Sequence, residues 1–316
     1  RSHAGSRRRC VRALMRIVHD RARVAVPATS GNLGPGFDCM GMAHDLWDEM
    51  EARVAPTSQA VEPWARIDIQ GEGADYLPRD NSHLVVRALR RGLEFAGVPQ
   101  PNLDLTCTNA IRQGRGLGSS ASAIVSGLLL ARGLIEDPQV LGDQVVLDLA
   151  TQFEGHPDNA APAIFGGAVV AWCDGAGAHA LPIHVREDLR ITLLIPDAEL
   201  LTETARSVLP ERVPHKDAAF NASRTALLVL ALEHDPDVLF EATEERLHQQ
   251  YRADSMRPSA NALIYLRKRR IPAVISGAGP SILVFGELED SVAAYMVESG
   301  FSVLSGAPAG GAYLLP

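Results

Sequence analysis

One glycine-serine stretch, Gly114-Arg-Gly-Leu-Gly-Ser-Ser-Ala-Ser122, stands directly before an apolar segment. Glycines let a backbone approach a ligand closely, and the free N–H groups of a helix start attract an anion. Neither lysine, Lys216 or Lys268, follows a glycine-rich run, which excludes a P-loop lysine. We therefore expect phosphates to rest on backbone N–H groups, a metal and Arg115. The alternative is a tightly packed helix start with serine capping.

A second polar group lies in Glu154-Gly-His-Pro-Asp-Asn-Ala-Ala-Pro162. Glu154 can supply an oxygen to Mg²⁺. His156, Asp158 and Asn159 can orient an ammonium or hydroxyl group. The two prolines of the segment predict an extended, stiff chain. The alternative is a turn in which the Asp and the Asn bond to their own backbone.

A third glycine-punctuated stretch, residues 29–38, contains Asn32 and Asp38. It follows a predicted strand and must fold tightly, so that both side chains could face the same pocket. An Asx turn and a helix cap are the alternative roles for these two residues.

The elements that must position these groups follow from hydrophobic periodicity. The predicted strands are 23–26, 65–70, 103–108, 166–173, 190–195, 273–276, 282–285, 301–304 and 312–315. The predicted helices are 82–95, 119–134, 137–153, 202–209, 217–233, 237–250 and 289–299. This mixture predicts two α+β domains, with a boundary near 175–188 that begins in a Gly- and Ala-rich loop.

Composition excludes several classes of function. The chain has 316 residues, 46% apolar residues and a formal net charge of −8. The acidic balance argues against a nucleic-acid partner, which selects a basic surplus. The uninterrupted apolar stretches are far shorter than the ~20 residues that a bilayer requires, so no membrane span is expected.

Two further features bear on organisation and compartment. Residues 1–23 carry eight arginines and one acid, and we expect them to form a disordered or vector-derived N-terminal extension. Four dispersed cysteines predict reduced, mostly buried thiols of a cytoplasmic protein rather than disulfides or a zinc site; they are Cys10, Cys39, Cys107 and Cys173.

These motifs resemble the GHMP kinase superfamily and, within it, the homoserine kinase family. Pro27–Gly41 is similar to the family's PASSANLGPGFDxxG block. Residues 114–122 are similar to its RGLGSSAA phosphate loop, and residues 154–167 continue this block. Residues 276–281 are similar to its SGAGPT motif. Together the blocks span nearly the whole chain from residue 24 onward.

The resemblance implies a two-domain GHMP kinase fold of the α+β class. Residues 24–180 would form an ATP-binding domain like ribosomal protein S5 domain 2, and residues 181–316 a ferredoxin-like domain. The implied reaction converts ATP and L-homoserine into ADP and O-phospho-L-homoserine in threonine biosynthesis, with Mg²⁺ as cofactor. It also implies that Asp158 binds the amino group and that the protein forms a homodimer. We expect direct in-line transfer without a dedicated base.

The same resemblance assigns site residues. It places the metal on Ser120 and Glu154, and catalytic roles on these two residues and Asn159. Its ATP-binding residues are Arg112, Gly114, Arg115, Gly116, Leu117, Gly118, Ser119, Ser120, Ala121 and Ser122. Its substrate-binding residues are Asn32, Asp38, His156, Asp158, Asn159, Thr202, Arg206 and Arg252.

Three positions depart from the family pattern: Gly31 replaces the usual Ala, Arg112 a proline and His83 an Asn near the adenine. Two alternatives stay open at this point. One is another small-molecule GHMP kinase, acting on mevalonate, a sugar or a diphosphocytidyl polyol. The other is a catalytically inactive nucleotide-binding member of the superfamily.

Overall fold

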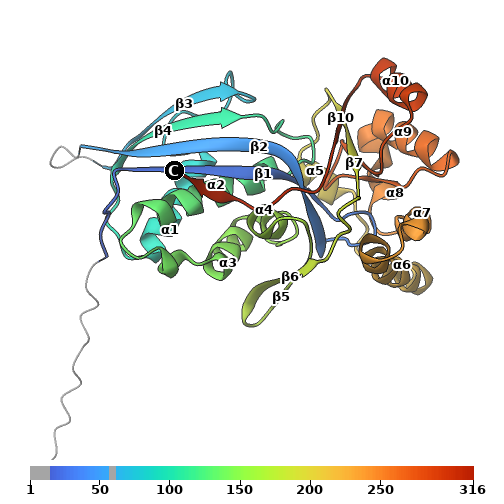
Figure 1. Cartoon of the computed structure of the whole chain (residues 1–316), viewed down its shortest axis with the longest axis horizontal. Coiled ribbons are helices and arrows are strands. Elements are labelled where there is room, and N and C mark those ends of the chain that lie inside the picture. The colour runs from blue at the N-terminus through green and yellow to red at the C-terminus, as the bar shows by residue number, and fades with distance from the viewer. Residues whose placement is uncertain (1–14, 57–61) are drawn as a thin grey trace, which may run out of the picture.

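The computed structural model describes residues 15–56 and 62–316, which form two β-sheets with helices packed on them (Figure 1). This confirms the predicted α+β class. The strands are β1 (Arg21–Gly31), β2 (Met40–Ala55), β3 (Ala65–Gly71), β4 (Asn102–Asn109), β5 (Ala168–Asp174), β6 (Gly177–Ile183), β7 (Ile191–Pro196), β8 (Ala273–Ile275), β9 (Ile282–Phe285), β10 (Phe301–Gly306) and β11 (Tyr313–Leu315). The α-helices are α1 (Leu84–Phe95), α2 (Ser119–Leu134), α3 (Asp143–Glu154), α4 (Ala160–Phe165), α5 (Thr202–Ser207), α6 (His215–Glu233), α7 (Leu239–Ala242), α8 (Gln249–Arg252), α9 (Arg257–Lys268) and α10 (Asp290–Glu298). Three short 3-10 helices lie at Pro138–Leu141, Pro236–Val238 and Ala253–Met256.

The first sheet has seven strands and is organised around the long strand β2. β2 pairs antiparallel with β1 along one edge, and with β4 and β5 at different ends of its other edge. β3 continues the sheet beyond β4 in the parallel sense, and β11 lies antiparallel beside β1. The last strand of the chain therefore returns to the first sheet, whereas the predicted division at 180/181 places it in the second domain.

Helices α1, α2 and α3 cover one face of the first sheet (Figure 1). α2 has the bounds predicted for it, and its apolar side chains are buried against both the sheet and the neighbouring helices. Gly127 lets α1 and α2 pack closely, because a Cβ at this position would lie 2.7 Å from the Cβ of Ala88. Burial of α2 on most sides fixes the position of its first turn.

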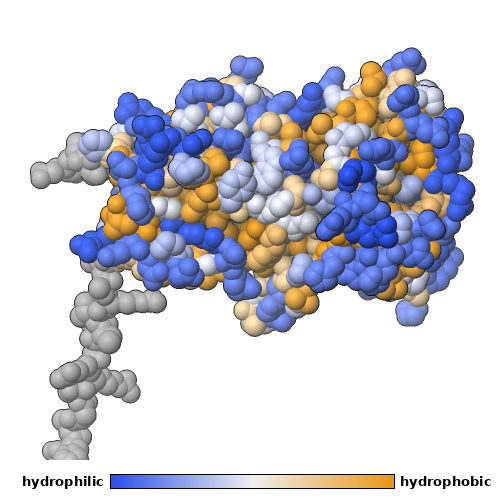
Figure 2. Space-filling view, in the orientation of Figure 1, coloured by the Kyte–Doolittle hydropathy of each residue, from blue (hydrophilic) through white to orange (hydrophobic). Residues whose placement is uncertain are grey.

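The second sheet has the strand order β10-β7-β9-β8 and is buried on both faces. One face packs against α6 and against residues from the ends of β1 and β2, such as Ala28 and Met42. The other face packs against α9 and α10. A shared core therefore joins the two halves of the molecule, and Figure 2 shows a mainly hydrophilic outer surface with scattered apolar patches.

Several elements differ from the sequence prediction. β2, β6 and α9 were not predicted, and β6 occupies part of the segment expected to be a loop. The helix predicted over 237–250 is interrupted, because the carboxylate of Glu245 accepts the N–H groups of Leu247, His248 and Gln249. This acceptor begins a separate short helix, α8, instead of continuing α7.

Two further differences lie near the predicted site. The helix predicted over 137–153 is divided at Gly142, which ends a 3-10 turn and caps α3. The segment with two prolines is not extended throughout, because α4 begins after Asn159. Pro162 lies in the first turn of α4, where a missing N–H breaks no helical hydrogen bond.

At the start of the chain, residues 1–14 lie outside the described residues, as does Cys10. Residues 15–23 are more ordered than the predicted extension: Ile17 forms a β-bridge with Ile135, and β1 begins at Arg21. Of the described cysteines, Cys107 is buried, Cys39 is half-buried and Cys173 is exposed, and all three are free thiols. Among residues 15–56 and 62–316, no helix has the length and apolar character needed to cross a bilayer.

We expect Gly127→Ala to lower the free energy of unfolding by about 1–3 kcal/mol, because overpacking at the α1–α2 contact costs that much. In an open helix the same change would stabilise by about 1 kcal/mol. Chemical denaturation measures the difference. Gly175→Ala is the control, since a Cβ there would meet no atom within 4 Å. A stabilised Gly127→Ala variant would contradict the packing described here.

Candidate functional site

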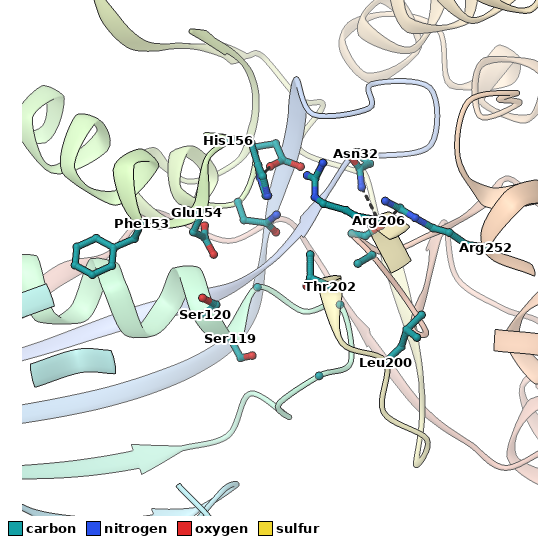
Figure 3. Close-up of a pocket in the computed structure, with 17 residues that line it drawn as sticks. Asn32, Ser119, Ser120, Phe153, Glu154, His156, Leu200, Thr202, Arg206 and Arg252 are labelled. Atoms are coloured by element: carbon teal, nitrogen blue, oxygen red, sulfur yellow. Dashed lines mark hydrogen bonds and ion pairs between the residues drawn. The ribbon is translucent and has the colours of Figure 1, made fainter. Parts of the chain in front are cut away.

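A cleft between the two sheets brings the three predicted polar stretches together (Figure 3). Its walls come from the ends of β1 and α3, the start of α2, and the segments around residues 200 and 277. The lining residues are Asn32, Gly114, Gly116, Gly118, Ser119, Ser120, Phe153, Glu154, His156, Asp158, Asn159, Leu200, Thr202, Arg206, Arg252, Gly277 and Ala278.

The glycine-serine loop is held through its carbonyl groups. All five carbonyls of residues 114–118 accept a hydrogen bond from elsewhere in the chain. In order, the donors are Leu200 N (2.9 Å), Ser281 N (3.1 Å), Ser276 Oγ (2.6 Å), Thr29 N (3.0 Å) and Ser122 N (2.8 Å). These donors belong to both halves of the molecule, so the loop is fixed only when the halves are packed together.

The N–H groups of the same loop remain available. None of those from residues 114–120 donates to the described part of the chain. Gly114, Gly116 and Gly118 have φ values of 65°, 73° and 69°, in the left-handed region that favours glycine. α2 follows directly, and no side chain caps its start. Consecutive free N–H groups at the positive end of a buried helix form a site for an anion such as phosphate.

The remaining predicted ATP-binding side chains do not line the cleft. Leu117 and Ala121 are buried in the core, and the hydroxyl of Ser122 donates to Asp48. Asp48 also accepts the N–H groups of residues 110 and 111, so that it fixes both ends of the glycine loop. Only the backbone of these residues is positioned to contact a nucleotide.

The two arginines of the loop are occupied by protein groups. Arg112 forms ion pairs with Glu72 at 3.4 Å and Asp197 at 3.2 Å. Arg115 pairs with Glu199 at 2.6 Å and donates to carbonyl groups of residues 113, 196 and 197. The structure therefore differs from the expectation that the Arg115 side chain holds phosphate, and this arginine instead ties the loop to the segment after β7.

Glu154 and Ser120 point toward each other at one side of the cleft (Figure 3). Glu154 ends α3 and Ser120 lies in the first turn of α2. The Oε2 atom of Glu154 is buried without a hydrogen-bond partner among the described residues. Burial raises the pKa of this carboxyl to about 7. An unpartnered carboxylate oxygen beside a hydroxyl fits a Mg²⁺ ion, which binds through one or two protein oxygens and phosphate.

The histidine, the aspartate and the asparagine of the second stretch form the top of the cleft. Nδ1 of His156 pairs with Oδ1 of Asp158. Burial acts to lower the pKa of His156, but the hydrogen bond and charge of Asp158 outweigh it and raise the pKa. Asn159 accepts a hydrogen bond of 3.0 Å from the hydroxyl of Thr29, which fixes its amide group.

The other side of the cleft carries two cations. Arg206 of α5 makes a bidentate pair with Asp38, at 2.7 and 3.1 Å. Arg252 is 1% exposed, donates to carbonyls of residues 205 and 277, and contacts Nδ1 of His248. Burial, and then the charge of Arg206, lower its pKa to about 10, so that it stays charged at neutral pH.

Asn32 joins this side of the cleft to the third stretch. Its side chain donates to the carbonyl of Gly277 at 2.9 Å and accepts the N–H of Asp38 at 2.9 Å. The bonds hold the loop of residues 32–38 closed, with Asn32 at φ 68° and Asp38 at φ 56°. Thr202, at the start of α5, also lines the cleft (Figure 3).

Sequence reasoning missed four residues that line the cleft, Phe153, Leu200, Gly277 and Ala278, and also Thr29, which donates to the lining residue Asn159. The sequence could have indicated two of these, because Gly277 and Ala278 lie in the SGAGP motif, which was identified but given no role in the site. Leu200 carried no signal, since only the folded chain brings its N–H to the carbonyl of Gly114.

Comparison with known proteins gives concordant matches. A model of the GHMP kinase N-terminal domain matches residues 83–167. A homoserine kinase of Clavibacter michiganensis subsp. michiganensis is 48% identical over 267 residues, covering 84% of this chain and 83% of the relative. One of Mycolicibacterium vanbaalenii is 46% identical over 291 residues, covering 89% and 91%.

Solved structures share the architecture. A homoserine kinase from Cytophaga hutchinsonii aligns with a TM-score of 0.78 at 24% identity, covering 94% of this chain and 98% of the other. A mevalonate kinase of L. major aligns with a TM-score of 0.66 at 14% identity, covering 93% and 99%. At such identities the two likenesses show a common fold and nothing about substrate.

We expect Gly116→Ala to weaken the binding of ADP by about tenfold or more, because the added Cβ would press against the backbone of Ser276 and Gly279 and displace the loop. Isothermal titration calorimetry measures the affinity. Gly97→Ala is the matched control, since its φ of 72° imposes the same strain in open space. Equal affinities for the two variants would contradict an anion site on this loop.

Proposed function

The chain belongs to the homoserine kinases of the GHMP kinase family, and we propose that the cleft carries out their reaction at the residues described above. The enzyme (EC 2.7.1.39) phosphorylates L-homoserine with ATP in threonine biosynthesis. The hydroxyl oxygen of homoserine attacks the γ-phosphorus, and the bond to the β–γ bridging oxygen breaks. The products are ADP and O-phospho-L-homoserine, and the hydroxyl proton is released.

One observation supports this proposal above the others: in one cleft lie two arginines, a row of amides and a carboxylate oxygen, and neither these amides nor this oxygen has a partner among the described residues. The amides of residues 114–120 suit the phosphates of ATP, because they offer donors without a lysine. Ser120 and Glu154 would hold Mg²⁺ beside them. When bound, Mg²⁺ neutralises charge on the phosphate oxygens.

The opposite side of the cleft suits an α-amino acid. Arg206 and Arg252 would bind the substrate carboxylate, with Thr202 beside them, because guanidinium groups fix both its charge and its orientation. Arg206 reaches this position already oriented, since Asp38 holds it in a bidentate pair. Placement of both cations on one side leaves the hydroxyl end of the substrate directed toward the phosphate loop.

Polar groups at the top of the cleft would bind the rest of the substrate. Asp158 carries a negative charge that suits the ammonium group, and Asn32, Asp38 and His156 surround the same space. Asn159 would lie near the reacting hydroxyl, with its amide held by Thr29. Positioning and charge stabilisation supply most of the rate of phosphoryl transfer, so the proposal includes no dedicated general base.

We also propose that the enzyme is a cytoplasmic homodimer. Free thiols, including the exposed Cys173, fit the reducing cytoplasm. A homodimer is implied by the family resemblance. Sedimentation velocity distinguishes a dimer from a monomer of 33.9 kDa.

Coupled release of ADP from Mg-ATP tests the function, with L-homoserine, L-threonine, L-serine and mevalonate as acceptors and mass spectrometry of the product. We expect turnover on homoserine with loss of at least tenfold in kcat/KM for Arg206→Ala, since a charged hydrogen bond is worth about 1.5–3 kcal/mol. Arg190→Ala, outside the cleft, is the control. Turnover on mevalonate alone would overturn the amino-acid site, and ATP binding without turnover would indicate an inactive member.

We expect activity at low Mg²⁺ to fall below about pH 7, because burial raises the pKa of Glu154 to about 7 and only the carboxylate binds the metal. Protons and Mg²⁺ compete for this group, so the midpoint should move to lower pH as Mg²⁺ increases. Steady-state profiles at several Mg²⁺ concentrations measure the shift. Glu154→Gln should have low activity, and its remaining activity should no longer fall below about pH 7. A midpoint independent of Mg²⁺ would remove Glu154 from the metal site.

A further inference from the structure

A buried chain of three side chains ends on the phosphate loop. Nε2 of His44 lies 2.6 Å from the hydroxyl of Ser30, which lies 2.5 Å from the hydroxyl of Ser276. Ser276 in turn donates to the carbonyl of Gly116 at 2.6 Å. The three side chains are at most 1% exposed. They come from β2, β1 and the turn after β8, so that the chain links both sheets to the loop.

Strand register explains the first contact. Ala28 of β1 is opposite His44 of β2, and Ser30 is opposite Met42. Residues two apart on a strand share a face, so Ser30 and His44 are diagonal neighbours on one side of the sheet. Thr29 points to the other side, where it contacts Asn159. The end of β1 therefore supports the cleft through two separate side-chain contacts.

The Gly116 carbonyl, at the end of this row of hydrogen-bonded groups, determines the direction of every hydrogen bond in the row. A carbonyl only accepts, so the single proton of Ser276 is used on Gly116. Ser276 must then accept, and the single proton of Ser30 is used on Ser276. Ser30 must accept as well, so His44 donates through an Nε2–H group. The Nδ1 atom of His44 is left as an acceptor, and it has no partner among the described residues.

A neutral imidazole with one N–H satisfies this arrangement. A second proton on Nδ1 would create a buried donor without a partner, which is costly. Burial lowers the pKa of His44 to about 3, in agreement with a neutral ring. The neutral ring of His44 has one N–H donor, and this donor is used in the hydrogen bond to Ser30.

The Gly116 carbonyl is a distinctive point of the loop. Of the five carbonyls of residues 114–118, it is the one whose donor is a side chain, while backbone N–H groups serve the other four. In a trans peptide the C=O group and the following N–H point in opposite directions. Holding the Gly116 carbonyl toward Ser276 therefore orients the N–H of Leu117 away from that turn.

We propose that His44 is a positioning residue for ATP, acting through Ser30 and Ser276 to orient the peptide between Gly116 and Leu117. The proposal rests on the proposed function in that the phosphate loop binds ATP. His44 itself does not line the cleft. Loss of its N–H leaves the Ser30 oxygen without its donor, so Ser30 holds the Ser276 hydroxyl less firmly and the restraint on the loop weakens.

Steady-state kinetics of His44→Leu and His44→Gln in the full chain test this role. We expect His44→Leu to raise KM for ATP by about tenfold, the effect of one hydrogen-bond network, with KM for homoserine within about twofold. His44→Gln should recover most of the loss, because its amide supplies an N–H donor. Unchanged KM for ATP, an equal rise in both KM values, or no recovery by Gln would overturn the proposal.

Two serine variants test transmission along the chain. Ser276→Ala should raise KM for ATP, and adding His44→Leu should have little further effect, because both changes break one path. Ser281→Ala is the matched control, since its buried hydroxyl in the same turn has no partner among the described residues. Additive effects of Ser276→Ala and His44→Leu, or an equal effect of Ser281→Ala, would contradict the path.

A measurement on the unmodified protein does not depend on folding of the variants or on turnover. Nitrogen-15 NMR of histidine-labelled protein, with His44 assigned from the spectrum of His44→Gln, reports which ring nitrogen carries the proton. We expect a neutral Nε2–H form from pH 5 to 8. A proton on Nδ1 would overturn the proposal even if the kinase were active, and the expected tautomer in an inactive protein would refute only the proposed function.

Discussion

The fixed carbonyls of residues 114–118 are the constraint on which the site depends. Five consecutive acceptors are satisfied by the chain, while the adjacent amides donate to none of the residues that the structure describes. Most residues of the loop are half-buried at the wall of the cleft, so a ligand or water can supply acceptors to these donors. The fold therefore holds the loop in a conformation that an anion stabilises. The donors come from β1, α2, the segment before α5 and the turn before β9, which explains why two sheets share a core around this point.

Charge in the cleft is separated along its length. Glu154 places near the phosphate loop a carboxylate oxygen that has no partner in the described part of the chain, whereas Arg206 and Arg252 place positive charge on the far side. Asp38 and Asp158 offset part of that positive charge through Arg206 and His156. A substrate that carries both a carboxylate and an ammonium group matches this pattern, whereas a neutral polyol would leave the buried Arg252 without a carboxylate partner.

Much of the fold and the outline of the site could be predicted from local patterns. α2 was predicted to the residue, because small apolar residues follow a glycine-serine motif, and the three polar stretches do meet in one cleft. The failures have tertiary causes. Glu245 divides a predicted helix by accepting three amides, and Glu199 forms an ion pair with Arg115 that no local pattern indicated. The hydrogen bond between the N–H of Leu200 and the carbonyl of Gly114 joins residues far apart in the sequence, so no local pattern could predict it.

The position of β11 has a consequence for the order in which contacts can form. β11 pairs with β1, although most of the described residues separate these two strands in the sequence. The turn at residues 276–281, which holds the phosphate loop, is likewise far from that loop in the sequence. During synthesis α1, α2 and β1–β4 emerge before these partners do, so the loop can form its hydrogen bonds to the turn only after residue 281 has been translated. Contacts of such long sequence separation are slow to form, because the loop-closure entropy is lost before they are made.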